Sequence, residues 1–183
     1  MGRKYKFRDQ QSAYFVTFTV VDWIDVFTRN DYRVILVDSI KYCQQNKGLL
    51  VYAWVIMTNH VHLIIGTDGT KQLERIVGSL KRHTSQVLRE AINENPAESR
   101  KRWMKWIFER EGLYNPNNTD WQLWQQHSHP IDLSDPFMSK QRLDYLHNNP
   151  VKAGFVTEPQ YWQWSSAFDY CGGKGPIDVI FME

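Results

Sequence analysis

The sequence predicts an α+β fold in which a ferredoxin-like antiparallel four-stranded sheet carries helices on one face. Apolar, β-branched runs and amphipathic stretches follow one another in the order strand, helix, strand, strand, helix, strand, which is the order of that fold. The second and third strands are separated only by Thr58 and Asn59, so they must be antiparallel neighbours. A chain of 183 residues is long enough for one well-packed domain and short for two.

The first half of the chain supplies three strands and two helices. The first strand is rich in β-branched and aromatic side chains (AYFVTFTVV). Asn30 or Asp31 can cap the first helix, and Lys47 and Gly48 end it. The second helix is long and amphipathic. The predicted strands are residues 13–21, 49–57 and 60–65, and the predicted helices are residues 30–46 and 71–93.

The second half begins with a polar insertion and supplies the last strand. The insertion starts at Pro96 and interleaves basic residues with Trp103, Trp106 and Phe108. A later short helix stops before Pro150, because the residue that precedes a proline is biased away from the helical region. The predicted segments are the insertion over about 96–120, a fourth strand within 121–133, and short helices over 139–146 and 162–170.

Composition excludes several protein classes. The net charge of +2 is too small to indicate nucleic-acid binding by itself, so any basic surface must be local. Cys43 and Cys171 are too few and too far apart for a disulfide framework or a zinc ribbon. The start MGRKYKFR has no apolar leader, and the longest apolar run, residues 49–57, is too short to span a bilayer. We therefore expect a cytoplasmic protein without a membrane partner.

Two histidines on the third strand are the first candidates for chemistry. Side chains alternate along a strand, so His60, His62 and Ile64 should face one way and their neighbours the other. Two imidazoles on an otherwise apolar strand are typical of a divalent metal site, although hydrogen bonds to core carbonyls would also satisfy them. A second pair, His127 and His129, is a weaker candidate because Pro130 favours a strand end or edge.

Basic residues gather at two places in the first half of the chain. The N-terminal arm, residues 1–12, alternates basic and aromatic side chains and could neutralise phosphates and stack on bases, although a solvated terminus is equally compatible. The polar face of the second helix could contact phosphate or simply face water. The basic residues are Arg3, Lys4, Lys6 and Arg8 in the arm and Lys71, Arg75, Lys81, Arg82 and Arg89 on the helix.

Five segments carry a family resemblance. In order over residues 14–168, YFVTFTV, AWVIMTNHVHLII, LKRHTSQ, WQLWQQHSHPI and LDYLHNNPVKAGFV resemble the single-tyrosine HUH transposases of small insertion sequences, most closely the REP-associated tyrosine transposases. The resemblance implies that residues 1–183 form a single HUH domain. The insertion over 96–120 matches nothing in the short family members.

The resemblance also implies a set of site residues. His60 and His62 would hold Mg²⁺ or Mn²⁺, Tyr145 would be the nucleophile, and Asn149 would be the third metal ligand. Residues four apart on a helix share a face, so Tyr145 and Asn149 could both face the histidine strand. Because Asn149 precedes Pro150, His147 or a water is the alternative ligand. On composition alone, Tyr145 would simply pack its helix on the sheet.

The implied activity is nicking and rejoining of single-stranded DNA next to a hairpin, through a 5′-phosphotyrosine intermediate. A phenol has a pKa near ~10 and needs help to attack a phosphodiester at neutral pH. Lys81, Arg82, Arg89 and the basic cluster over 100–105 are candidates for contacts to the hairpin, and the arm could take the flanking strand. Both a homodimer and a monomer are compatible with the resemblance.

Two other functions compete with the transposase hypothesis. A domesticated protein of the same fold could bind hairpins or palindromes without cleaving them, which a Tyr145 remote from His60 and His62 would favour. An unrelated metallohydrolase could use the histidine pair with zinc or iron and a further carboxylate or histidine ligand, and it would give Tyr145 no role.

Overall fold

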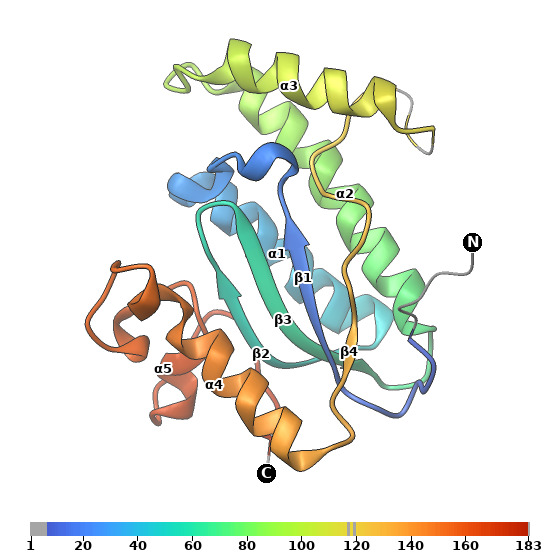
Figure 1. The fold of residues 1–183 in the computed structure, drawn as a ribbon, viewed down its shortest axis with the longest axis vertical. Helices are drawn as coiled ribbons and strands as arrows, with labels where there is room; N and C mark the ends of the chain where they lie inside the picture. The colour runs from blue at the N-terminus through green and yellow to red at the C-terminus, as the bar shows by residue number, and fades with distance from the viewer. Residues whose placement is uncertain (1–6, 117, 119, 183) are drawn as a thin grey trace.

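The protein is a four-stranded antiparallel sheet with helices on both faces (Figure 1). The structure is a computed structural model, and it describes residues 7–116, 118 and 120–182. The described elements are β1 (Tyr14–Thr19), η1 (Val21–Trp23), η2 (Val26–Thr28), α1 (Asn30–Lys47), β2 (Leu49–Ile56), β3 (His60–Thr67), α2 (Leu73–Glu94), α3 (Lys101–Tyr114), β4 (Ile131–Asp132), α4 (Pro136–Lys152), η3 (Pro159–Tyr161) and α5 (Ala167–Tyr170).

The sheet has the predicted ferredoxin-like topology. Its strand order is β2-β3-β1-β4, and every neighbouring pair is antiparallel. β3 therefore lies at the centre, paired with β2 on one side and with β1 on the other. In the register of β1 and β3, Thr17 is opposite His62 and Thr19 is opposite His60. The two histidines consequently lie beside short hydroxyl side chains on that face.

Each face of the sheet has its own apolar core. The larger core joins Val61, Leu63 and Ile65 of β3 to α1 and α2. The smaller core joins Ile64 of β3 to Leu146 of α4. α1 and α2 lie behind the sheet and α4 in front of it (Figure 1). The prediction of helices on one face thus holds for α1 and α2, whereas the helix predicted over 139–146, which is part of α4, lies on the opposite face.

The predicted C-terminal cap of α1 is present, but the predicted N-terminal cap is not. Neither Asn30 nor Asp31 caps the helix, because the N-cap position is occupied by Arg29 and has no side-chain cap. At the other end Gly48 has a φ of 71°, and its N–H donates to the Cys43 carbonyl, as predicted for a glycine C-cap. A Cβ at Gly48 would lie 2.0 Å from Asp68 Oδ1, so glycine is needed there for both conformation and space.

The fourth strand lies within the predicted segment but is only two residues long. Pro130 immediately before it lacks a backbone donor, and His129 has a φ of 41°, so regular pairing cannot extend toward the N-terminus. A separate bridge between Val20 and Trp124 continues the contact with the rest of the sheet. None of the helices that the structure describes is long and apolar enough to cross a lipid bilayer.

Helix α4 is longer than predicted, because it does not stop before Pro150. The proline removes a single intrahelical bond, to the Leu146 carbonyl, and its ring is buried. The helix continues past the proline, since the Ala153 N–H donates to Asn149 O (3.0 Å), and it ends with a bond from the Phe155 N–H to Pro150 O (2.9 Å) after the left-handed Gly154. Asn149 therefore keeps its helical place one turn after Tyr145.

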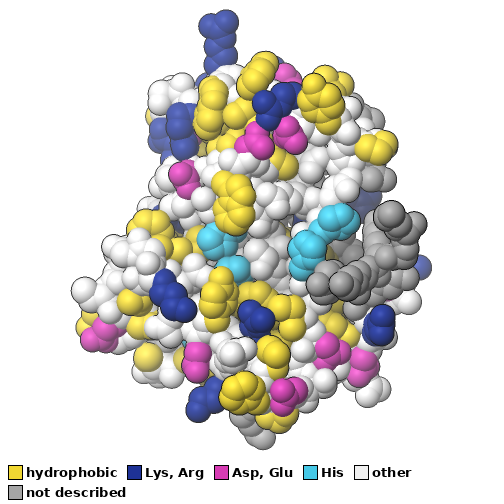
Figure 2. Space-filling model, viewed as in Figure 1, with side chains coloured by type: hydrophobic (Ala, Val, Ile, Leu, Met, Phe, Trp, Pro, Cys, Tyr) yellow, Lys and Arg dark blue, Asp and Glu magenta, His cyan; other side chains and the backbone are white. Residues whose placement is uncertain are grey.

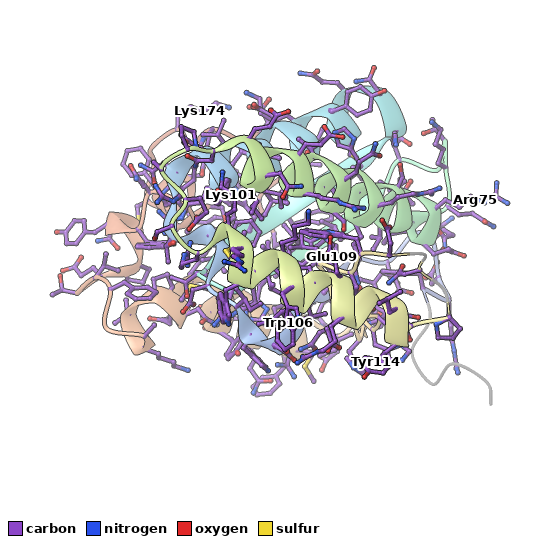
Figure 3. The ribbon with its side chains drawn as sticks, turned by 90° about the horizontal axis from the view of Figure 1, so that it is seen from above. Arg75, Lys101, Trp106, Glu109, Tyr114 and Lys174 are labelled. Carbon is purple, nitrogen blue, oxygen red and sulfur yellow. The ribbon has the colours of Figure 1, made fainter. Side chains whose placement is uncertain are left out.

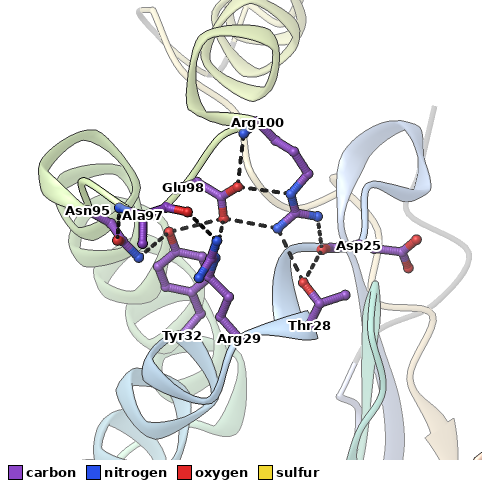
Figure 4. Close-up of polar contacts among 8 residues, drawn as sticks. All are labelled: Asp25, Thr28, Arg29, Tyr32, Asn95, Ala97, Glu98 and Arg100. Atoms are coloured by element: carbon purple, nitrogen blue, oxygen red, sulfur yellow. Dashed lines mark hydrogen bonds and ion pairs between the residues drawn. The ribbon is translucent and has the colours of Figure 1, made fainter.

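The insertion over 96–120 is organised by a buried carboxylate. Glu98 is 2% exposed and accepts from Arg29 Nε and Arg100 Nε, both at 2.9 Å (Figure 4). The Arg100 guanidinium lowers the pKa of Glu98 to about 2, and Arg100 Nη1 also donates to the Asp25 carbonyl at 2.8 Å. Arg100, a candidate phosphate contact from the sequence, thus anchors α3 to η2 and α1.

Candidate active site

The two histidines of β3 face α4, as the strand alternation predicts. Their rings lie 4.7 Å apart between centroids, and the ring of Phe15 stacks on His62 at 5.1 Å. His62 is 5% exposed, whereas His60 is half-buried at the start of the strand. The pair therefore forms the floor of a site that is closed at His62 and open at His60.

His62 has one ring nitrogen that no described residue satisfies. Nδ1 lies 2.8 Å from Thr17 Oγ1, whereas Nε2 is buried without a hydrogen-bond partner among the described residues. Burial, helped by the positive potential of His60 and Arg142, lowers the pKa of His62 to about 3. A neutral imidazole with a buried, unpartnered nitrogen costs about 1–3 kcal/mol unless a ligand uses that nitrogen. This is the state in which histidine binds a metal.

His60 and Asn149 complete the same donor set. His60 Nδ1 lies 2.7 Å from the Asn59 side-chain oxygen, which accepts from it and leaves Nε2 for another partner. Burial lowers the pKa of His60, and a hydrogen bond with the Asn149 side chain opposes that shift. The structure thus brings Asn149 to His60. Among the described residues no group of three His, Cys, Asp or Glu side chains could hold a metal.

Tyr145 lies on α4 beside the histidines. Its ring is 5.4 Å from that of His62 and 6.0 Å from that of Phe15. The side chain is 37% exposed, so the phenol is open to a substrate rather than packed into the core. Tyr145 and Asn149 share one face of α4, as their spacing predicts. The ring thus packs on two side chains of the sheet, as composition alone would predict, and its partial exposure distinguishes it from a core tyrosine.

A groove of about 550 Å³ runs along α4 at Tyr145, and it contains two basic residues that the sequence reasoning did not select. Arg142 lies 5.5 Å over the Phe15 ring, and the Lys152 ammonium lies 5.4 Å from the centre of the Tyr145 ring. The groove is lined by Gln141, Arg142, Asp144, Tyr145, Asn148 and Lys152. Arg142 is three residues before Tyr145 and Lys152 is seven residues after it, so a helix places both cations on the same side as Tyr145. This spacing is the sequence signal that could have identified them.

Trp23 is a further residue at the site without an obvious sequence signal. Its ring centroid lies 6.1 Å from that of His60, and the side chain is 59% exposed. Asp22 and Trp23 have φ values of 51° and 54°, a left-handed conformation that costs about 1–3 kcal/mol for each such residue. The Asn59 side chain donates to the Trp23 carbonyl at 3.3 Å. The backbone therefore holds an exposed indole next to His60.

His147 does not take part in the site. Its Nε2 lies 2.9 Å from Ser166 Oγ, and its ring lies 5.0 Å from that of Tyr170. The imidazole is buried against α5, so it is not the alternative third ligand that the sequence left open.

We expect this buried histidine to make the protein acid-labile. Burial lowers the pKa of His147 from its ordinary 6.5 to about 4, so below pH 6.5 the unfolded chain binds more protons than the folded one. The free energy of unfolding should then fall by up to about 1.4 kcal/mol per pH unit as the pH drops toward 4. His147→Gln should reduce this slope in urea titrations over that range, while His60 and His62, whose pKa values burial also lowers, keep their share of it. An unchanged slope would assign the acid lability to other groups.

The predicted DNA contacts lie in different environments. Arg8 and Arg82 are exposed. The Lys81 ammonium donates to Gln125 O at 2.7 Å, and burial lowers the pKa of Lys81 to about 8. Arg89 is paired with Asp120 at 2.9 Å. Lys81 and Arg89 thus tie α2 to the segment that leads to β4. Arg3, Lys4 and Lys6 lie outside the described residues.

The second histidine pair is separate from the first. The rings of His127 and His129 lie 5.8 Å apart, and Ser128 between them accepts from the Thr17 N–H at 3.2 Å. This pair is therefore at the β1 edge of the sheet. Histidine side chains form two distinct groups on this face of the molecule (Figure 2).

Comparison with solved structures shows which proteins share this fold. Over its whole length the chain is similar to the structure of a REP-associated tyrosine transposase bound to a REP hairpin, with 16% identity, 96% of that chain covered and a TM-score of 0.66. A suggested transposase from Deinococcus radiodurans R1 matches 81% of this chain and 95% of its own, with 20% identity and a TM-score of 0.45. No protein of curated function matches the sequence.

A family model supplies the assignment. The model described as "Transposase IS200 like" matches residues 10–111, which is more than half of the 183-residue chain. The matched region includes β1, β3 and both site histidines, and it ends before α4. On this match, the chain belongs to the IS200-like transposase family.

Proposed function

We propose that this transposase nicks and rejoins single-stranded DNA beside a hairpin, with Tyr145 as the nucleophile. The observation that carries the proposal is the meeting of two elements far apart in the sequence. β3 supplies the neutral histidines, and α4 supplies Tyr145, whose ring centroid lies 5.4 Å from that of His62, and Asn149, whose side chain opposes the lowering of the His60 pKa. Tyr145 is 37% exposed and lies beside a buried imidazole nitrogen that has no partner among the described residues.

The family resemblance implies Mg²⁺ or Mn²⁺ as the ion at this site. His60, His62 and Asn149 would hold the ion through two imidazole nitrogens and one amide oxygen, and the unpartnered Nε2 of His62 supports this assignment. When bound, the ion would polarise a non-bridging phosphate oxygen and stabilise the departing 3′ oxygen. Thr17 and Asn59 would orient the two imidazoles from the other side of each ring.

Tyr145 would carry out the covalent step. Its phenolic oxygen attacks the phosphorus, its proton leaves to water in the open groove, and the bond from phosphorus to the 3′ oxygen breaks. The 3′ oxygen takes up a proton, so the products are a free 3′-hydroxyl and a 5′-phosphate ester on Tyr145. Attack by a second 3′-hydroxyl reverses the step at a new junction and releases Tyr145.

Arg142 and Lys152 flank the phenol and would attract the phosphate to it. We expect Lys152→Gln to slow cleavage roughly tenfold to a hundredfold, somewhat less than the loss of a donor aimed directly at a reacting oxygen. Lys140→Gln is the matched control, because Lys140 is exposed on the same helix but does not line the groove. Single-turnover cleavage rates measure both variants, and equal rates for the two would remove Lys152 from the mechanism.

The DNA partner is proposed as a hairpin with an unpaired flank. The structural relative is bound to a REP hairpin, and Arg8 and Arg82 offer exposed cations for phosphates. Lys81 and Arg89 suit that role less well, because the protein already engages both.

The decisive test uses single-stranded hairpin oligonucleotides from the flank of this gene on a denaturing gel. A 5′-phosphotyrosine link retains the fragment on the 3′ side of the nick. A 3′-end label should therefore migrate with the protein, whereas a 5′-end label should appear in a short free fragment. Both products should need Mg²⁺ or Mn²⁺ and disappear with chelator. A native-gel shift without cleavage, under every metal, would replace the proposal with a hairpin-binding protein.

A further inference from the structure

Helix α3 exposes two large aromatic side chains, Trp103 and Trp106. Its inner face packs Met104, Ile107 and Phe108 into the main core. On the outer face, Trp103 and Trp106 are 51% and 59% exposed. Seen from above, Trp106 lies on the side of α3 turned away from α2 (Figure 3). Exposed tryptophans on a helix that already buries an apolar face indicate a binding surface.

A hollow between these tryptophans is suited to a flat, negatively charged ligand. It has a volume of about 400 Å³ and is lined by Ser99, Arg102, Trp103 and Trp106. Arg102, Trp103 and Trp106 are neighbours on the surface of α3, and Ser99 lies in the turn before the helix. The lining holds two indoles, one hydroxyl and one guanidinium, and it has no carboxylate. A nucleobase could stack on an indole while Arg102 contacts its phosphate.

The surface is connected to the candidate active site. The Arg110 guanidinium lies 5.0 Å over the Trp106 ring, and it donates to Asp22 Oδ2 at 2.6 Å. Asp22 immediately precedes Trp23, whose ring lies 6.1 Å from that of His60. Exposed hydrophobic side chains lie on the same face of the molecule as the histidines (Figure 2). Trp23 and Trp106 thus lie on either side of one ion pair.

We propose that Trp23, Trp103, Trp106 and Arg102, here called the aromatic strip, bind the unpaired strand of the DNA substrate and lead it to His60. The proposal rests on the function proposed above and assigns a role to the insertion. The bases stack on the indoles, so binding along the strip depends on aromatic faces more than on base sequence.

Several features favour nucleic acid over a protein partner. The tryptophans are interrupted by basic side chains instead of forming one continuous apolar patch. The carboxylates beside them are engaged within the protein: Asp22 and Glu111 by Arg110, and Glu109 by Lys105. Arg102 is therefore the exposed charge in the hollow, and its sign suits phosphate.

The test measures stacking separately from catalysis. Fluorescence anisotropy would follow the binding of labelled dT12 and of an abasic strand of equal length and charge, all in the Tyr145→Phe background. We expect Trp106→Ala to weaken dT12 binding roughly tenfold, the effect of losing about one stacked base. The abasic strand should bind the parent and Trp106→Ala equally, because it has no base to stack. Tyr42→Ala is the control, since Tyr42 is 54% exposed on α1, behind the sheet.

The outcomes separate the two proposals. No cleavage is needed, so a failure of the Tyr145 chemistry leaves the anisotropy result intact. Equal losses for dT12 and the abasic strand, or no loss for either, would overturn the role of stacking. Sedimentation velocity tests whether a second copy of this chain binds the aromatic strip instead. If the parent is a dimer that Trp106→Ala dissociates, and dT12 binding is unchanged, the strip is a protein interface and the proposal is wrong.

Discussion

Tyr145→Phe should abolish the covalent DNA adduct while leaving hairpin binding unchanged. The substitution removes one oxygen from a ring that packs against His62 and Phe15 and lies beneath Lys152. All three contacts involve the ring face or edge, so the fold and the groove should persist. Without the phenolic oxygen no phosphotyrosine can form. We expect cleavage to fall by more than roughly a thousandfold, since removal of a covalent nucleophile typically costs that much or more.

Tyr161→Phe is the matched control for this experiment. Tyr161 is 63% exposed and lies in η3, outside the groove at Tyr145. The control should form the metal-dependent adduct at the rate of the unaltered protein. Adduct formation by Tyr145→Phe would show that another side chain attacks the phosphate. Loss of hairpin binding in the same variant would show that the substitution disturbs the DNA surface as well.

The parts of the site that depend on strand alternation could be predicted from the sequence. His60 and His62 face the same way because they are two residues apart on a strand. Ile64 follows them into the smaller core, and Val61, Leu63 and Ile65 enter the larger one. The short turn at Thr58 and Asn59 required β2 and β3 to pair, and this is the pairing that the sheet shows.

The parts that depend on tertiary packing could not be predicted. A proline normally ends a helix, but the buried Pro150 lies within the last turn of α4, where packing outweighs one lost hydrogen bond. The backbone is left-handed at Asp22 and Trp23, and neither position is a glycine, which is the usual sequence signal for this conformation. Lys81 reads as a solvent-facing cation from its helical position, although its ammonium is bound to the Gln125 carbonyl. Long-range contacts decide each of these cases.

His62→Leu should remove metal binding without destabilising the metal-free protein. Leucine fills similar space against Phe15 and eliminates the buried Nε2 that has no partner among the described residues. The variant leaves the half-buried Thr17 hydroxyl without its partner, and water can replace that bond. Removing an unsatisfied buried group is worth about 1–3 kcal/mol, so the melting temperature without metal should be equal to that of the parent or higher.

Added Mn²⁺ distinguishes a ligand from a core histidine. A metal at a hundred times its dissociation constant stabilises the folded protein by about 2.7 kcal/mol, which corresponds to a rise of roughly 5–10 °C in the melting temperature for a chain of this size. The parent should show this rise, lose it on chelation, and share it with His127→Leu, which alters the separate histidine pair at the sheet edge. His62→Leu should show no rise and no cleavage. If His62→Leu kept the Mn²⁺-induced rise, the ion would be bound elsewhere, and the buried nitrogen of His62 would need another explanation.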